Sequence, residues 1–257
     1  MVHNQKIEVE WHCWGQRNHP TLVFLHEGLG CVSLWKDFPS QLSRLTRCNA
    51  FVFSRLGHGK SDPCLTPRKI NFMHSEARNF LPAVLQAAKI GNHIIIGHSD
   101  GGSIGLINAG SPGADRLNGL ITEAAHVFCE PLTTEAIKLA RHNFLNQDLK
   151  KRLEKYHGPN TDHAFWGWNN VWLHPKFIHW NIQKFLSRIK VPVMALQGRQ
   201  DPYGTPAQLA AIAAGVKDCN AHLIDQCSHS PHKDQQETVL ASMARFINTI
   251  SAASTQS

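Results

Sequence analysis

The stretch Gly97-His98-Ser99-Asp100-Gly101-Gly102 follows directly on the apolar run His93-Ile94-Ile95-Ile96. A serine between small residues, placed after a buried strand and before a helical segment, fits the Gly-x-Ser-x-Gly pattern of a nucleophile elbow. The serine of such a turn adopts a strained backbone conformation, which is tolerated only where the flanking glycines leave room. The stretch therefore predicts that Ser99 presents its hydroxyl above the carboxyl end of a strand.

Apolar, β-branched runs alternate with helical patterns along the rest of the chain. In residues 75–90, apolar side chains recur every three or four residues, which predicts a helix with one buried face. Similar helical patterns lie at 101–109, 206–214 and 235–250, and strand-like runs lie at 7–14, 21–26, 50–54, 93–98, 117–125, 191–198 and 220–225. The alternation predicts an α/β fold, a mostly parallel sheet flanked by helices.

One segment, residues 129–188, breaks this alternation. It has helical stretches, no convincing strand, and a dense group of aromatic residues. An insertion of this size is expected to pack over the carboxyl ends of the strands, where open α/β sheets bind ligands. We therefore predict an α/β core at 1–128 and 189–257 with a helical cap at 129–188. The candidate pocket residues in the cap are Trp166, Trp168 and Trp172, although any one of them can instead join cap to core.

The composition is that of a packed globular protein, with 42% hydrophobic and 18% charged residues. The net charge is +7, but the basic residues are scattered and form no nucleic-acid-binding motif, so we predict no nucleic-acid partner. No apolar run is long enough to cross a bilayer and residues 1–8 lack the apolar segment of a signal peptide, which predicts a cytoplasmic protein that does not bind membranes. The seven cysteines include no Cys-x-x-Cys pair, which predicts free thiols.

A serine hydroxyl needs a base that accepts its proton and a carboxylate that orients the base. His229 follows the last strand-like run and is the candidate base. His232 fits the start of the final helix, and His98 lies inside the elbow, which directs it elsewhere. A metal site built on His229 and His232 lacks a third ligand at suitable spacing, so we predict no metal.

Asp201 is the candidate orienting acid. It lies in Gln197-Gly198-Arg199-Gln200-Asp201-Pro202, at the carboxyl end of a strand-like run. Glu123 and Glu130, which follow the preceding strand-like run, are the alternatives.

The oxyanion that forms when a serine attacks a carbonyl needs two N–H donors. A helix that begins at Asp100 directs its free amides and its positive end toward Ser99, so the Asp100 amide is one candidate. The run at 21–26 leads into His26-Glu27-Gly28-Leu29-Gly30, whose glycines let the backbone turn close to the serine. The Gly28 amide is the second candidate, with a plain loop as the alternative, and Glu27 is a candidate pocket residue.

These segments resemble the α/β-hydrolase superfamily over nearly the whole chain. The order Ser99, Asp201, His229 is the family's order of nucleophile, acid and histidine. Two positions depart from the family pattern, because Glu27 replaces the usual glycine after the histidine and Asp100 stands where an uncharged residue is common. The segments that carry the resemblance are His26-Glu27-Gly28-Leu29-Gly30, Ser54-Arg55-Leu56-Gly57-His58-Gly59-Lys60-Ser61, which resembles the Arg-x-Gly-x-Gly-x-Ser loop, the elbow, residues 198–201 and Ser228-His229-Ser230-Pro231.

The resemblance implies a two-step acyl transfer by Ser99, His229 and Asp201 that needs no metal or organic cofactor. The implied function is that of a serine hydrolase acting on a carboxylic ester, lactone or thioester. The expected partner is a small-molecule acyl substrate, aromatic or apolar. A C–C bond hydrolase, an acyltransferase and a slow-turnover binding protein on the same scaffold stay open, as does the oligomeric state, a homodimer included.

Overall fold

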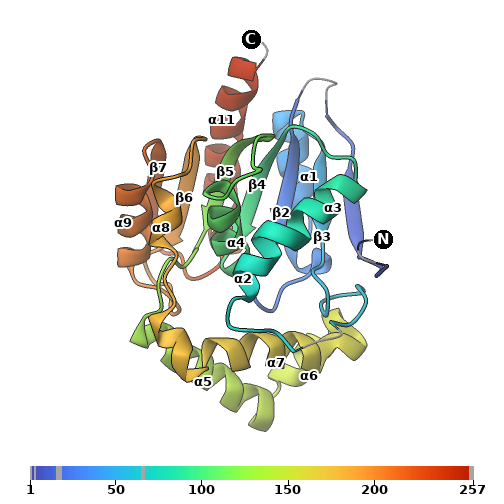
Figure 1. Cartoon of the computed structure of the whole chain (residues 1–257), viewed down its shortest axis with the longest axis vertical. Coiled ribbons are helices and arrows are strands. Elements are labelled where there is room, and N and C mark those ends of the chain that lie inside the picture. The colour runs from blue at the N-terminus through green and yellow to red at the C-terminus, as the bar shows by residue number, and fades with distance from the viewer. Residues whose placement is uncertain (1, 3, 16–18, 65–66, 255–257) are drawn as a thin grey trace.

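The computed structural model describes residues 2, 4–15, 19–64 and 67–254. Within these residues the chain forms a seven-stranded sheet in the order β1-β3-β2-β4-β5-β6-β7 (Figure 1). β1 pairs antiparallel with β3, and the other neighbouring strands pair in parallel. The strands are β1 (Val9–His12), β2 (Thr21–Leu25), β3 (Ala50–Phe53), β4 (His93–His98), β5 (Leu117–Glu123), β6 (Val193–Gly198) and β7 (Cys219–Ile224).

Helices cover both faces of this sheet, which confirms the predicted fold class (Figure 1). The side chains of β4 alternate between two cores, because Ile95 packs in one and Ile94 and Ile96 pack in the other. A strand buried on both faces therefore reads as a continuous apolar run. One face carries α2 (Phe72–Ser75), α3 (Leu81–Ala87), α4 (Asp100–Ala109), α8 (Gln183–Leu186) and α9 (Pro206–Gly215), and the other carries α1 (Phe38–Thr46) and α11 (Gln236–Ser254).

Two helical regions differ from the sequence pattern. α1 is a helix that was not predicted, although Phe38, Leu42 and Thr46 repeat at four-residue spacing and are all buried in it. The helix predicted at 75–90 begins earlier, at α2, and contains a π-helical turn, Glu76–Phe80, before α3. That turn precedes Pro82, which has no N–H to give to the helix ladder.

The residues between β5 and β6 form helices and no strand, as the sequence predicts. α5 (Pro131–Asn146), α6 (Leu149–His157) and α7 (Thr161–Trp172) lie together across one end of the sheet (Figure 1). α8 packs against α4 and α9 instead. The division into a core and a cap at 129–188 stays a prediction.

All seven cysteines carry free thiols. In the described part of the chain, no helix is both long and apolar enough to cross a membrane.

Candidate active site

The turn after β4 holds Ser99 in a strained conformation. Ser99 has φ 52° and ψ −116°, in a region that residues other than glycine rarely occupy. A side chain at Gly97 would collide with the Gly101 carbonyl, and one at Gly101 would collide with the Leu25 carbonyl. Both glycines are therefore required for the close approach of strand, turn and helix. The Ser99 N–H donates to the Glu123 carbonyl at 2.8 Å, which holds the turn against β5.

Ser99, His229 and Asp201 form a continuous chain of hydrogen bonds. The Ser99 Oγ lies 2.9 Å from Nε2 of His229, and Nδ1 of His229 lies 2.8 and 2.9 Å from the two carboxylate oxygens of Asp201. Asp201 follows β6 and His229 follows β7, so the parallel strands bring both to the edge of the sheet where Ser99 lies. The geometry is that in which a histidine can accept the proton of a serine hydroxyl while a carboxylate orients the ring.

Asp201 is held as a carboxylate by its neighbours. Burial acts to raise its pKa, but the hydrogen bond and charge of His229 and the Tyr203 N–H, which donates at 2.8 Å, outweigh burial and lower the pKa. Gln197 donates a further hydrogen bond to Asp201 at 3.1 Å and is itself fixed by the Gly204 carbonyl. Every bond that Asp201 receives favours its charged form.

The alternative residues considered from the sequence are bound elsewhere. Glu123 is fully buried and pairs with His232, whose Nδ1 lies 2.6 Å from its carboxylate. Glu130 accepts hydrogen bonds from Thr205 and Gln208 at the start of α9. His98 turns away from the hydroxyl, and its Nε2 donates to the His229 backbone carbonyl at 2.7 Å. None of them takes the place of Asp201 or His229.

The N–H groups of Gly28 and Asp100 are available to a ligand. Asp100 is the first residue of α4, so its N–H has no partner within the helix. Among the described residues, no acceptor bonds the Gly28 N–H either. Both residues line the same cavity as Ser99.

The peptide between Glu27 and Gly28 is held from its carbonyl side. Nη2 of Arg55 donates to the Glu27 carbonyl at 2.8 Å. Nε2 of His26 accepts from the Arg55 N–H at 3.0 Å, so its Nδ1 carries the proton and donates to the same carbonyl at 2.7 Å. In a trans peptide the N–H points opposite to the carbonyl. Two donors on the Glu27 carbonyl therefore aim and polarise the Gly28 N–H.

Two further histidines hold the same loop. Nε2 of His58 donates to the Gly28 carbonyl at 3.0 Å, and its Nδ1 accepts from Arg68 at 3.1 Å. Nε2 of His157, at the end of α6, donates to the Leu29 carbonyl at 2.9 Å. The Arg-x-Gly-x-Gly-x-Ser loop thus has a structural role that spacing alone does not reveal, since it supports the loop that carries Gly28.

We expect Arg55→Met to lower kcat for an ester substrate by about ten- to hundredfold with a smaller change in KM. The reason is that loss of a whole oxyanion donor lowers turnover by about 10²–10³-fold, and Arg55 acts on that donor indirectly. Methionine keeps the apolar stem of the side chain and removes the guanidinium that donates to the Glu27 carbonyl. Arg199→Met, at an exposed arginine paired with Asp225, is the control. A kcat equal to that of the control would contradict this role.

The Asp100 side chain contacts α7. It is fully buried and its Oδ1 accepts from the Trp172 indole N–H at 3.1 Å, while Oδ2 has no hydrogen-bond partner among the described residues. Burial raises the pKa of Asp100, and the nearby positive charge of Arg55 partly opposes that rise. Asp100 thus joins α4 to α7.

A cavity of about 150 Å³ lies above Ser99. Of the predicted pocket residues, Glu27, Trp168 and Trp172 line it, whereas Trp166 does not. Four further residues line the cavity without having been predicted to do so. His126 and Tyr203 lie on the loops after β5 and β6, and Thr133 and Ile137 belong to α5. The complete lining is Glu27, Gly28, Leu29, His98, Ser99, Asp100, His126, Thr133, Ile137, Trp168, Trp172, Tyr203, His229 and Ser230.

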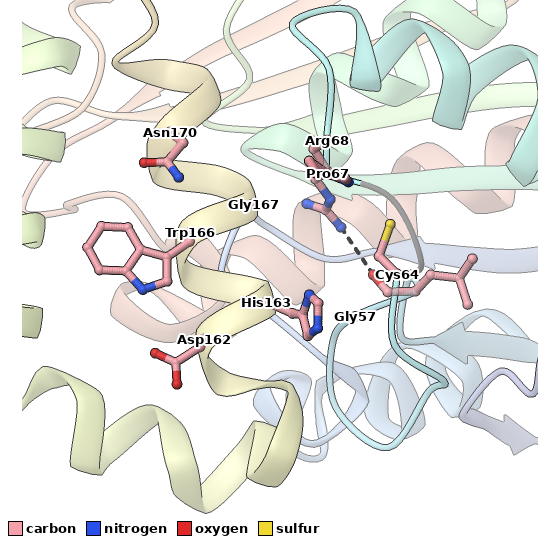
Figure 2. A pocket seen from close by; sticks show the side chains of 10 residues that line it. Gly57, Cys64, Pro67, Arg68, Asp162, His163, Trp166, Gly167 and Asn170 are labelled. Atoms are coloured by element: carbon pink, nitrogen blue, oxygen red, sulfur yellow. Dashed lines mark hydrogen bonds between the residues drawn. The ribbon is translucent and has the colours of Figure 1, made fainter.

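Trp166 lines a different pocket, of about 390 Å³. Figure 2 shows this pocket between α7 and the loop that carries Gly57, Cys64 and Arg68. The prediction that Trp166 lines the cavity above Ser99 is therefore wrong. Its ring lies on the side of α7 opposite to Trp168 and packs against Phe144 of α5.

The site rests on buried, neutral histidines. Burial holds the pKa values of His26, His58 and His98 well below the ordinary 6.5. Their unfolded forms take up protons as the pH falls through 6.5, while the folded forms do not. Stability is therefore complete above this pH and is lost below it, by about 1.4 kcal/mol per group between pH 7.5 and 5.5.

We expect the free energy of unfolding in urea to fall by at least about 3 kcal/mol between pH 7.5 and 5.5. His26, His58 and His98 together contribute about 4 kcal/mol. Burial also lowers the pKa values of His74, His93, His126 and His157, which add to the fall, and Asp100, whose pKa is raised, partly offsets it. His98→Gln, which keeps a donor for the His229 carbonyl, should remove about 1.4 kcal/mol of this dependence. Equal stability at both pH values would contradict the neutral state of these side chains.

Among the described residues, no cluster of three or more His, Cys, Asp or Glu side chains is arranged to hold a metal ion.

Residues 22–242 match the model of the Alpha/beta hydrolase family. No curated protein matches the sequence. Among solved structures, the fold is similar to that of proline iminopeptidase from Mycobacterium smegmatis, with a TM-score of 0.74, 18% identity and 98% of both chains covered. It is also similar to a thermophilic esterase from Thermogutta terrifontis, with a TM-score of 0.74, 16% identity and 96% of this chain and 94% of that chain covered. For the enol-lactonase from Burkholderia xenovorans the TM-score is 0.72, with 16% identity and 96% and 98% covered.

Proposed function

The chain belongs to the alpha/beta hydrolase family, and from that premise we propose that it is a serine hydrolase that cleaves a small carboxylic ester, lactone or thioester. Hydrogen bonds of 2.9 Å from Ser99 to His229 and 2.8 Å from His229 to Asp201, at a strained elbow, carry this proposal. The strain supports a functional role, because a serine held at positive φ is retained only where the surrounding structure demands it.

In the first step the Ser99 Oγ forms a bond to the substrate carbonyl carbon while its proton passes to Nε2 of His229. The carbonyl oxygen becomes an oxyanion, which the N–H groups of Gly28 and Asp100 stabilise. As the oxyanion collapses, the bond to the leaving oxygen or sulfur breaks and that atom takes the proton from His229. Asp201 keeps Nδ1 of His229 protonated and stabilises the positive charge on the ring.

In the second step water attacks the acyl group on Ser99. His229 accepts the proton from water, and the new oxyanion accepts hydrogen bonds from the same two N–H groups. Collapse of this oxyanion then breaks the bond between the acyl carbon and Oγ. The proton on His229 returns to Oγ, which releases the carboxylic acid and restores the serine. No step requires a group beyond the side chains, the two amides and water.

The cavity supports a small acyl group. Its volume of about 150 Å³ is below the roughly 300–1,000 Å³ that is usual for drug-sized ligands. Trp168 and Trp172 give it apolar walls. Short or compact acyl chains fit this space, and long chains require α5 or α7 to move.

A fluorophosphonate probe and a series of p-nitrophenyl esters test the proposal. We expect the probe to label Ser99 covalently, as located by peptide mass spectrometry, and kcat/KM to fall from acetate and butyrate to decanoate. Repeated turnover distinguishes an enzyme from a binding protein, which would show saturable binding without steady product release. Failure of both labelling and turnover would overturn the proposal.

A further inference from the structure

The cavity above Ser99 is bordered by acidic groups. Glu27 and Asp100 line it, and no lysine or arginine is among its described lining residues. Arg55 acts electrostatically on both carboxyl groups, but it lies behind the loop, where it bonds the Glu27 carbonyl. A negatively charged acyl group would therefore face carboxyl groups without a cation to pair with.

Glu27 presents its carboxylate without a protein donor. The side chain is half-buried and curls over the turn that it begins, so that its carboxylate lies against the Cα of Gly30. In the part of the chain that the structure describes, no side chain hydrogen-bonds or ion-pairs with this carboxylate, not even Lys233, which borders an adjoining cavity. A half-buried carboxylate beside a cavity is free to accept a charge-assisted hydrogen bond from a ligand that enters it.

His126 also lies on the wall of this cavity and is neutral. Only 2% of its surface is exposed. Its Nε2 lies 2.9 Å from the Tyr203 carbonyl, which can only accept, so Nε2 carries the proton. Nδ1 is itself buried, and no partner reaches it among the described residues. Burial keeps the ring neutral by lowering its pKa, so His126 adds no positive charge that would repel a cation in the cavity.

These observations point to a ligand that brings donors and positive charge. We propose that the substrate of the hydrolase proposed above carries an amine on its acyl group, held by the Glu27 carboxylate. A protonated amine has three N–H donors and one positive charge, which suits this acceptor. Trp168 and Trp172, on the same wall, add aromatic faces that attract a cation. The substrate class is thus an aminoacyl ester or a close relative.

Phenyl esters of alanine and of isobutyrate test this inference. Their acyl groups differ only in an ammonium group that replaces a methyl group. The ammonium also activates the carbonyl inductively, and the ratio of the two uncatalysed rates measures that activation. The ratio of the kcat/KM values, divided by the ratio of the uncatalysed rates, therefore isolates recognition of the amine. At pH 7, wild type should prefer the alanine ester by roughly ten- to hundredfold, the effect of a hydrogen bond between charged groups. The uncatalysed rates measured without enzyme are subtracted.

Variants assign the preference to residues. Glu27→Gln keeps the shape of the side chain and should reduce the ratio by about tenfold or more. Glu154→Gln removes the same charge from an exposed position on α6 and should keep the wild-type ratio. Because each ratio compares two substrates on one variant, a partly unfolded preparation does not alter it.

Two outcomes overturn the inference in distinguishable ways. If the isobutyrate ester is hydrolysed and Ser99 is labelled, but the alanine ester is not preferred or Glu27→Gln keeps the ratio, the amine site is wrong and the hydrolase stands. If neither ester is hydrolysed and the fluorophosphonate does not label Ser99, the hydrolase falls and the amine site falls with it.

Discussion

Ser99→Ala is expected to remove essentially all hydrolysis of p-nitrophenyl esters, with kcat lower by about 10⁶-fold. The change removes the Oγ atom that forms the acyl bond, and no other hydroxyl group lies at hydrogen-bonding distance from Nε2 of His229 among the described residues. The amides of Gly28 and Asp100 remain. A small rate above that of water therefore persists, because binding and oxyanion stabilisation act without a nucleophile.

The double variant Ser99→Ala/His229→Ala is the informative control. Residues that act as one unit lose their effect together, so the double variant should be no slower than Ser99→Ala alone. The chain should stay folded, because the elbow depends on Gly97 and Gly101 and not on the hydroxyl. A Ser99→Ala variant that retains more than about 1% of wild-type kcat would show that another group attacks the substrate.

Much of this site can be predicted from the sequence because its information is local. The elbow needs Gly97, Ser99 and Gly101 within one turn, and the structure shows that backbone carbonyls fill the space that side chains would need. Asp201 and His229 each follow a strand-like run, and parallel strands bring their carboxyl ends to one edge. A strand, a turn and the order of residues therefore suffice to bring these side chains together.

Local patterns fail where three-dimensional packing selects among similar residues. His126 is one of 17 histidines, and only the position of the loop after β5 makes it part of the cavity. The position of Trp166 could have been predicted from helix geometry. Side chains of residues two apart on a helix point about 200° apart. Trp168 and Trp172, four apart, share one face of α7, and Trp166 cannot share it with them.

Asp201→Asn is expected to lower kcat by about 10⁴-fold with the fold intact. With its Oδ1 kept on the Tyr203 N–H, the asparagine places an NH₂ group where Oδ2 accepts from Gln197. Oδ1 would still lie near Nδ1 of His229, but the NH₂ would stand at the 2.9 Å that now separates Nδ1 from Oδ2, so an N–H donor would face the Nδ1–H. The repulsion between the two donors is relieved when Nδ1 gives up its proton and accepts from the NH₂. His229 would then carry its proton on Nε2, toward Ser99, and could no longer accept the serine proton.

The surroundings of Asp201 make this conflict hard to relieve. Gln197 also donates to the Gly204 carbonyl at 2.9 Å, so turning its amide to accept from the asparagine would lose that bond. Asp225→Asn, at an exposed carboxylate paired with Arg199, is the matched control and should keep wild-type kcat. Proton NMR provides a second readout, because the Nδ1–H signal of His229 should vanish in Asp201→Asn alone. A kcat within tenfold of wild type, with that signal retained, would mean that Asp201 only packs against His229 and does not set its tautomer.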